Sequence, residues 1–420
     1  MLFDNVLLEQ FCRRLVRRGS LTVIDAKGRR HEAGTGTPAV TVRLHDPSLH
    51  WKLAIRPEVA AGEAYTKGTL TLENGSTIYD LIDLVAANME GDSVYSAARL
   101  LRTADAFRRL RQFNPVKRSE RNVAHHYDLT TGFYRLFLDD DMQYSCAYFR
   151  HDDDSLEAAQ AYKKNRLAAK LFLQPGQRVL DIGCGWGGLA LSLAGAAEDV
   201  EVTGLTLSRP QLETARFRAE QARIADRVHF LAQDYRHHQG TYDRIVSVGM
   251  FEHVGINHYR TFFDQVARLL NDDGVCVLHT IGRAAGPGAT DPWIQRYIFP
   301  GGYSPALSKI LPHIERARLW ATDVEVMRLH YAETIRHWRR RFLAKRDEVI
   351  ELYNEEFARM WEYYLVVSEI AFRRLDSVVF QIQIAKSQDT LPLTREYMWS
   401  GNDDTEFSES RNTDSHRRSA

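Results

Sequence analysis

A glycine-rich turn in the middle of the chain has the most recognisable chemistry. The segment VLDIGCGWGGLAL, residues 179–191, joins an apolar run, a turn containing Gly183, Gly185 and Gly187, and the start of a helical pattern. Glycines remove side chains where a ligand contacts the backbone and where φ is positive. With Gly188 the segment also satisfies the dinucleotide fingerprint, and a strand-to-helix turn without any ligand is a further alternative.

Asp181 discriminates between the two cofactor classes. It lies two residues before the first glycine of the turn. An acid in this position would repel a pyrophosphate, whereas it accepts hydrogen bonds from the ammonium group of a methionine-like cofactor. The sequence therefore favours S-adenosylmethionine over NAD.

Further cofactor contacts are expected on the next two strands. FLAQDYR places Asp234, followed by Tyr235, at the end of a strand, where an adenine amino group can donate to the carboxylate; a routine loop aspartate is the alternative. Many methyltransferases of this fold end the second strand with an acid that binds the ribose, but here that strand reads VTGLTLS. Neutral groups must then hold the ribose, and Thr206 and Gln211 are the candidates.

The elements that position these residues alternate between apolar strands and helices. The predicted strands are residues 178–184, 200–207, 228–234, 242–249 and 274–282, and the intervening helices include 208–222 and 259–270. A helical region, 328–375, precedes a last strand at 377–386. This pattern predicts an α/β fold with a doubly wound parallel sheet, in which ligands bind beyond the carboxyl ends of the strands. Together with the glycine turn and Asp181, it indicates a Rossmann-like class I methyltransferase fold.

A small α+β domain is predicted before this sheet. A helix is expected over residues 4–18, and period-two alternation predicts strands at 21–25, 39–44, 50–56 and 69–73. Ser76 is the expected N-cap of a helix over 76–89. The predicted boundaries are therefore an N-terminal domain at 1–92, a linker at 93–118, a catalytic domain at 119–400 and a disordered tail at 401–420.

The linker region is strongly basic. Between Arg99 and Arg121 eight Lys or Arg accompany two acids, Asp105 and Glu120, with apolar residues interleaved. One interpretation is an amphipathic segment that rests on anionic lipid headgroups; the other is a solvated helix between domains.

Composition restricts the class of partner. Fifty-five Lys and Arg balance fifty-five Asp and Glu, which argues against a dedicated nucleic-acid binder. Four scattered cysteines form no metal-binding or disulfide pattern, and we expect neither a metal site nor a secreted protein. The chain contains no signal-peptide pattern and no apolar run of about 18 residues. We expect a cytoplasmic protein that approaches any membrane from its surface.

Several longer motifs together resemble the cyclopropane-fatty-acyl-phospholipid synthases and, more distantly, the mycolic acid cyclopropane synthases. These motifs are NVAHHYDLTTGFYRLFL, MQYSCAYF, VLDIGCGWGG, SVGMFEHVG, LHTIG and HYAETIRHW. The resemblance implies transfer of the sulfonium methyl carbon to an alkene in an acyl chain. The resulting carbocation then loses a proton from the transferred methyl group to a bound bicarbonate, and the ring closes. An enzyme that leaves a methyl or methylene branch is the closest alternative.

By motif matching, five residues would surround the bicarbonate: Cys146, Glu252, His279, the main chain of Ile281, and Tyr331. Glu252 would accept the bicarbonate hydroxyl proton, while His279 and Tyr331 would donate to its oxygens. Without the motifs, Cys146 reads as a small buried hydrophobe, His279 as a core histidine and Tyr331 as an aromatic on a helix face.

The resemblance also carries expectations about the cofactor lid and the partners. Tyr144 and Ser145 would contact the methionine portion of the cofactor, and Ser368 stands where some members have a cysteine. The N-terminal domain resembles a sterol-carrier-like lipid-binding domain, which favours an unsaturated phospholipid in a bilayer as the substrate. The family resemblance also implies a homodimer that acts at the inner membrane surface. A non-catalytic lipid carrier and a methyltransferase for small metabolites or nucleic acids are the alternatives from other classes.

Overall fold

The computed structural model describes residues 12–13, 15–89 and 129–399. Most of the predicted helix at 4–18, the basic linker at 93–118 and the tail at 401–420 lie outside the described residues, as do the predicted domain boundaries at 92 and 118.

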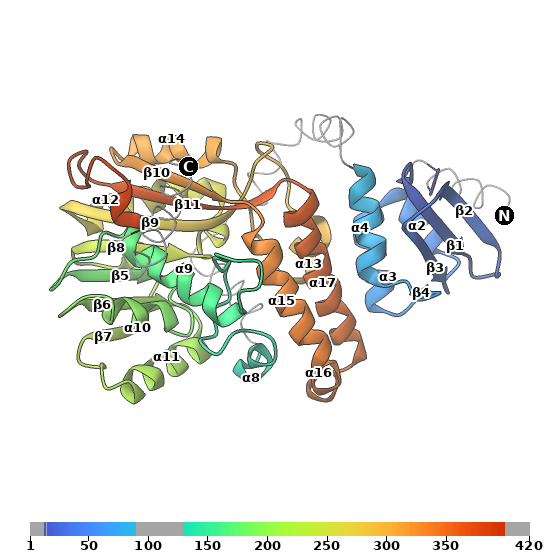
Figure 1. The fold of residues 1–420 in the computed structure, drawn as a ribbon, viewed down its shortest axis with the longest axis horizontal. Coiled ribbons are helices and arrows are strands. Elements are labelled where there is room, and N and C mark those ends of the chain that lie inside the picture. The colour runs from blue at the N-terminus through green and yellow to red at the C-terminus, as the bar shows by residue number, and fades with distance from the viewer. Residues whose placement is uncertain (1–11, 14, 90–128, 400–420) are drawn as a thin grey trace, which may run out of the picture.

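A seven-stranded sheet organises residues 129–399 (Figure 1). Its order is β10-β11-β9-β8-β5-β6-β7, and the five strands from β9 to β7 run parallel. β11 is antiparallel to both of its neighbours. The strands are β5 Arg178–Ile182, β6 Glu201–Thr206, β7 Val228–Ala232, β8 Tyr242–Val248, β9 Leu270–Arg283, β10 Trp320–Met327 and β11 Ser377–Ala385. The predicted doubly wound α/β fold is confirmed, although β10, a half-exposed edge strand, was not anticipated.

Helices cover both faces of this sheet. They are α9 Leu156–Lys170, α10 Gly188–Ala194, α11 Arg209–Gln221, α12 Tyr259–Leu269 and α14 Leu307–Arg316. Two shorter helices, α8 Thr131–Arg135 and α13 Pro292–Tyr297, instead pack through Phe133 and Trp293 against Trp361 and Tyr363. Ser155 and Ser208 cap α9 and α11 by accepting a hydrogen bond from a main-chain N–H in the first turn. The predicted helical region consists of α15 His330–Ala344, α16 Arg346–Leu352 and α17 Glu355–Arg374, which lie between the sheet and the N-terminal part (Figure 1).

The described residues of the N-terminal part form a four-stranded sheet in the order β2-β1-β3-β4, together with helices. The strands are β1 Gly19–Ile24, β2 Arg30–Thr35, β3 Ala39–Leu44 and β4 Leu70–Glu73, and the helices are α2 Leu49–Ile55, α3 Pro57–Thr66 and α4 Ile78–Met89. β2 is a further unpredicted edge strand. Its sequence RHEAGT is mostly polar and has little of the apolar alternation that marks a strand.

Two local predictions in this part are wrong. Residues 50–56 were expected to form a strand, but the structure has helix α2, in which Leu53 is buried and Trp51 and Ile55 are exposed. Three alternating apolar residues fit a short helix as well as a strand, since positions four apart share a helix face. Ser76 does not cap α4. Its hydroxyl accepts from the Thr41 N–H, and Thr77 forms the cap instead, because its hydroxyl accepts from the Asp80 N–H at 3.2 Å.

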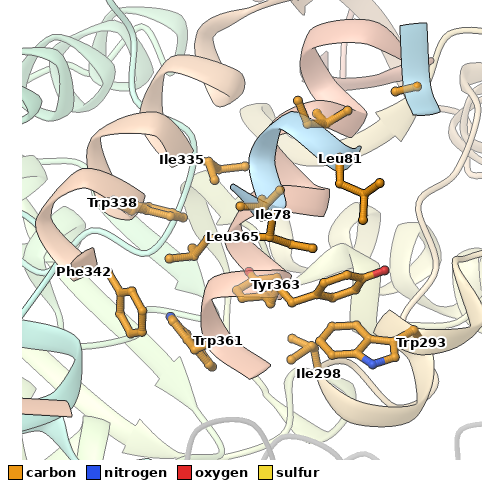
Figure 2. Close-up of a cluster of buried hydrophobic side chains, with 14 of the residues drawn as sticks. Ile78, Leu81, Trp293, Ile298, Ile335, Trp338, Phe342, Trp361, Tyr363 and Leu365 are labelled. Carbon is orange, nitrogen blue, oxygen red and sulfur yellow. The ribbon is translucent and has the colours of Figure 1, made fainter. Parts of the chain in front are cut away.

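The two parts pack through a shared hydrophobic cluster (Figure 2). Ile78 and Leu81 of α4 belong to the same cluster as Trp293 and the α17 residues Trp361 and Tyr363. Polar contacts surround this cluster: Tyr65 donates to Glu362 at 3.0 Å, Tyr297 to Glu63 at 2.6 Å, and Arg374 to Asp83 at 2.8 Å. The N-terminal part is therefore docked on α13 and α17 by both apolar and charged contacts.

Candidate active site

A first cavity lies at the carboxyl ends of β5, β6, β7 and β8, and we call it the donor cavity. The switch in strand order between β5 and β8 leaves a crevice there, as the sheet topology requires. Of the ten predicted cofactor residues, nine line this cavity: Tyr144, Ser145, Asp181, Gly183, Gly185, Thr206, Gln211, Asp234 and Tyr235. These nine residues come from the ends of β5, β6 and β7, from α11 and from the loop that contains Tyr144 and Ser145.

Gly187 does not line the donor cavity. Its φ of 83° and its position as N-cap of α10 suit a glycine, and a Cβ there would lie 2.7 Å from Phe230 and 2.9 Å from Ala215. Gly187 therefore permits close packing of α10. Gly183, with φ of 89°, faces the cavity, and a Cβ there would lie 2.7 Å from Met250.

Asp181 presents an unsatisfied carboxylate oxygen to the donor cavity. The side chain is 1% exposed, and Oδ2 has no hydrogen-bond partner. Burial raises the pKa of Asp181 to about 7, and the nearby Lys163 opposes that rise. An ammonium group beside Oδ2 would satisfy the oxygen and favour the ionised form. The chemistry of this site thus fits the amino group of S-adenosylmethionine.

The other polar residues of the donor cavity are engaged with neighbours. Thr206 Oγ1 lies 3.2 Å from Gln211 Oε1, so the two residues predicted to hold the ribose are in contact. Asp234 accepts from Arg236 Nη2 at 2.6 Å and from Nε at 2.9 Å. Burial alone would raise the pKa of Asp234, but the hydrogen bonds from Arg236 outweigh it and the pKa is lowered. The carboxylate is ionised and oriented, and it retains capacity to accept from an adenine amino group.

A second cavity, of about 1650 Å³, adjoins the first, and we call it the large cavity. It is lined by all five residues assigned to the bicarbonate: Cys146, Glu252, His279, Ile281 and Tyr331. The N-terminal part contributes much of the apolar wall, with Leu21, Val23, Val42, Leu44, Leu53, Leu70, Leu81, Ile82, Val85 and Met89. Tyr144, Ser145, Gly249 and His253 line both cavities and form the boundary between them.

Glu252 is an acidic residue that lines the large cavity and precedes His253, which lines both cavities. Its Oε1 accepts from the Ile281 N–H at 2.6 Å, and its Oε2 is buried without a partner. Burial raises the pKa of Glu252 to about 7. The unpartnered oxygen is suited to accept a hydroxyl proton. A ligand that used the Ile281 N–H would share this donor with Glu252.

His279 and Cys146 are both buried but differ in what they offer. His279 lies on β9 opposite Val248, at the carboxyl end of β8, and burial lowers its pKa well below the usual value, so the ring is neutral. Its Nδ1 is 3.2 Å from Gln381 Nε2. Burial raises the pKa of the Cys146 thiol, which donates to the Ala147 carbonyl at 3.3 Å. Cys146 is therefore a packing group and not a thiolate.

Aromatic rings surround the boundary between the cavities. Tyr144 stacks on Trp338 with ring centroids 5.2 Å apart, and its hydroxyl lies 2.8 Å from that of Tyr364. Tyr331 packs against Phe372 at 4.7 Å. Ring faces attract positive charge, so this wall suits a cationic centre. Ser368 also lines the large cavity.

Three residues at the site were not identified from the sequence. Lys163, fully buried on α9, donates to Gln143 Oε1 at 2.6 Å and to Ser145 Oγ at 3.0 Å, beneath the loop that separates the cavities. Gln381 contacts His279 from β11. His253 follows Glu252 directly in the FEHVG motif, so its place in that motif could have identified it as a site residue. Lys163 and Gln381 belong to no motif, and only the folded chain brings them to the site.

We predict that the affinity for S-adenosylhomocysteine rises with pH through about 7, because the ammonium group pairs only with ionised Asp181, whose pKa is raised to about 7. Asp181→Asn should weaken binding by about 10-fold to 100-fold, the range for a hydrogen bond to a charged group, and should flatten the pH dependence. Isothermal titration calorimetry measures both effects. Asp243→Asn, which changes a residue beside the amino end of β5, is the control. Equal affinities in Asp181→Asn and the native chain would exclude this contact.

No helix among the described residues is long and apolar enough to cross a membrane. The described residues also contain no cluster of three or more His, Cys, Asp or Glu that could hold a metal ion.

Sequence comparison finds relatives that span most of the chain. The sequence model of the family described as mycolic acid cyclopropane synthetase matches residues 115–382. The cyclopropane-fatty-acyl-phospholipid synthase of Escherichia coli K12 is 37% identical over 351 residues, covering 84% of this chain and 89% of that protein. A probable fatty acid methyltransferase of Pseudomonas putida is 35% identical over 375 residues, covering 86% and 92%.

Structural comparison finds the same family for the C-terminal part of the chain. The crystal structure of the mycolic acid cyclopropane synthase CmaA1 complexed with SAH and CTAB superposes with a TM-score of 0.61 and 33% identity. The match covers 99% of that protein but only 65% of this chain. About a third of this chain thus has no counterpart in CmaA1.

Proposed function

This chain belongs to the mycolic acid cyclopropane synthetase family, and from that membership and the site geometry we infer its reaction. We propose that it transfers the methyl carbon of S-adenosylmethionine to the cis double bond of an unsaturated phospholipid acyl chain and closes a cyclopropane ring there. Family membership supports S-adenosylmethionine-dependent cyclopropanation of a lipid acyl chain. The phospholipid as the carrier of that chain and bicarbonate as the proton acceptor are proposed from the site.

The observation that carries the proposal is the pair of adjoining cavities. The donor cavity is lined by glycines and polar groups, whereas the large cavity is mostly apolar and shares Tyr144 and Ser145 with it. Small-molecule sites typically enclose about 300–1,000 Å³. The 1650 Å³ of the large cavity exceeds that range and suits a long hydrocarbon chain.

Some residues of the chain bind the methyl donor, and others stabilise the positive charge that develops on the acyl chain. When bound, S-adenosylmethionine supplies an activated methyl group and bicarbonate supplies a proton acceptor. Asp181 orients the donor through its ammonium group, and the aromatic wall with Tyr144 and Tyr331 faces the positive charge that develops on the acyl chain. Fixed groups aimed at developing charge are the largest contribution in many active sites.

Support for bicarbonate comes from the donor and acceptor pattern of the large cavity. Glu252 Oε2 is a buried acceptor without a partner, and the neutral His279 ring lines the same space. Bicarbonate has one hydroxyl group that can donate a hydrogen bond and two oxygens that accept. The hydroxyl group suits Glu252 Oε2, and an acceptor oxygen suits an N–H of the His279 ring. A buried carboxylate left alone beside a carbocation would itself be alkylated, so an exchangeable anion is the better base.

Support for a phospholipid comes from the N-terminal part. Its apolar residues complete the large cavity, and this part is docked on α13 and α17 by the contacts described above. A methyltransferase for a small metabolite would have no use for this wall. We further propose that the protein acts as a homodimer bound peripherally at the inner membrane surface.

The direct test incubates the purified protein with labelled S-adenosylmethionine and vesicles of unsaturated phospholipid, followed by mass analysis of the released acyl chains. The proposal predicts a gain of one methylene with loss of the alkene. A retained alkene would indicate a methyl or methylene branch, and absence of transfer to lipid would reject the substrate class.

We predict that the basic linker contributes to membrane contact. Changing Arg108, Arg109 and Arg111 to Glu should weaken co-sedimentation with anionic vesicles, because each basic residue near such a surface contributes about 1 kcal/mol. The same substitutions should matter little with neutral vesicles, which serve as the control. Unchanged co-sedimentation would favour a solvated linker.

A further inference from the structure

Gln381 is a buried polar residue that the reaction described above does not use. It lies on β11 directly opposite His279 on β9, and the two residues are 0% and 2% exposed. Gln381 Nε2 lies 3.2 Å from His279 Nδ1. His279 lines the large cavity, whereas Gln381 is not among the lining residues. Gln381 therefore stands behind His279, on the side of the ring away from the reaction.

The contact determines which ring nitrogen of His279 carries the hydrogen. Burial, with additional repulsion from Lys163 and Lys170, lowers the pKa of His279 well below its usual value, and the neutral ring has one donor and one acceptor nitrogen. An amide nitrogen only donates, so Nδ1 accepts and Nε2 carries the hydrogen. The amide carbonyl Oε1 has no partner, and a buried unpaired carbonyl is better tolerated than a buried unpaired N–H.

We propose that Gln381 is a positioning residue that holds His279 in the Nε2–H tautomer, so that the ring donates a hydrogen bond into the large cavity. This inference rests on the proposed function in that the recipient is the bound bicarbonate. Glu252 already supplies an acceptor there. In the other tautomer Nε2 would be a second acceptor, and it would repel the oxygens of the bicarbonate. In the Nε2–H tautomer the ring instead donates a hydrogen bond to one of these oxygens.

The tautomer is measured directly by NMR of the native protein labelled with ¹⁵N-histidine, with the His279 signals assigned by their loss in His279→Asn. The proposal predicts a protonated Nε2 and an unprotonated Nδ1 throughout about pH 6–8. A hydrogen on Nδ1, or a charged ring, would overturn it. This result does not depend on the substrate, so it stands or falls separately from the proposed function.

Two variants test the consequence for the reaction. Gln381→Met removes the donor at similar volume and should raise the bicarbonate concentration needed for half-maximal rate by about 10-fold to 100-fold, the usual effect of a supporting polar contact on a ligand site. Gln381→Glu should raise the pKa of His279, so that Nε2 donates only from the charged ring. Its activity should decrease as pH rises through that pKa, a dependence the native enzyme should lack.

Gln383→Met is the matched control. Gln383 is two residues further along β11, is 1% exposed and bonds to Tyr397 and Thr322 instead of a histidine. It should lower the melting temperature without changing the bicarbonate dependence. If both Gln381 variants fold and keep the native bicarbonate and pH dependence, the positioning role is wrong. If the native protein modifies no lipid but shows the Nε2–H tautomer, the proposed function fails while the tautomer assignment holds.

Discussion

Replacing Glu252 with Gln is expected to lower turnover by roughly 10²-fold to 10³-fold while the affinity for S-adenosylhomocysteine is unchanged. Removing one pre-oriented group that acts on developing charge typically has an effect of this size. Glutamine keeps the shape and still accepts from the Ile281 N–H through its carbonyl, but it places an NH₂ group where Oε2 now stands unpartnered. Methyl transfer to vesicles and calorimetry with the donor product measure the two effects.

The pH dependence gives this prediction a second readout. Burial raises the pKa of Glu252 to about 7, so the carboxylate becomes protonated and loses its acceptor as pH falls through that value. At a constant bicarbonate concentration, activity should therefore decrease as pH falls and Glu252 becomes protonated. Glu369→Gln is the control, because Glu369 is also buried but pairs with Arg339 and does not line the large cavity. Full activity in Glu252→Gln would exclude the proposed site.

Gly62→Leu is expected to abolish most activity on phospholipid vesicles, again with donor binding retained. A Cβ at Gly62 of α3 would overlap the Trp293 indole and lie 2.8 Å from Tyr363. Overpacking of this kind costs about 1–3 kcal/mol, enough to push α3 off α13 and α17. The N-terminal wall of the large cavity would then be displaced, which we expect to lower phospholipid turnover by about 10-fold to 100-fold.

The control for this prediction is Gly132→Ala in α8, where a Cβ meets nothing closer than Thr130 at 3.9 Å. Activity of Gly62→Leu is measured with vesicles, and donor affinity is measured separately by calorimetry. If the variant folds and modifies vesicle lipid at the native rate, the N-terminal part is not needed to complete the acyl site.

Residues encoded in local motifs were predictable, and residues brought in by distant contacts were not. Asp181 lies near the carboxyl end of β5, and the glycine turn and Glu252 follow β5 and β8, so sequence alone placed them at the ligand edge of the sheet. Gln381 and Lys163 reach the site only through strand pairing and burial. Gly187 was assigned to the cofactor from its motif, although its conformation and neighbours explain it by packing.

In the fold, too, elements with a clear local sequence pattern were predictable, and features that depend on distant contacts were not. The five parallel strands were predicted because they are short runs rich in Val, Ile and Leu that alternate with helical segments, whereas the edge strands β2 and β10 are mostly or partly polar and gave no such signal. The helix α2 was mistaken for a strand because too few apolar residues alternate to define a period. The docking of the N-terminal part, which completes the large cavity, depends on tertiary contacts such as Tyr65 with Glu362.

The most direct measurement of the central claim follows the hydrogens of the transferred carbon. The protein is supplied with S-adenosylmethionine that carries a fully deuterated methyl group, together with unsaturated phospholipid vesicles and bicarbonate, and the acyl products are examined by mass spectrometry and NMR. Ring closure through loss of a proton from that methyl group predicts a product without an alkene that keeps two of the three deuterium atoms. A product that keeps all three, or that retains a double bond, would contradict the account.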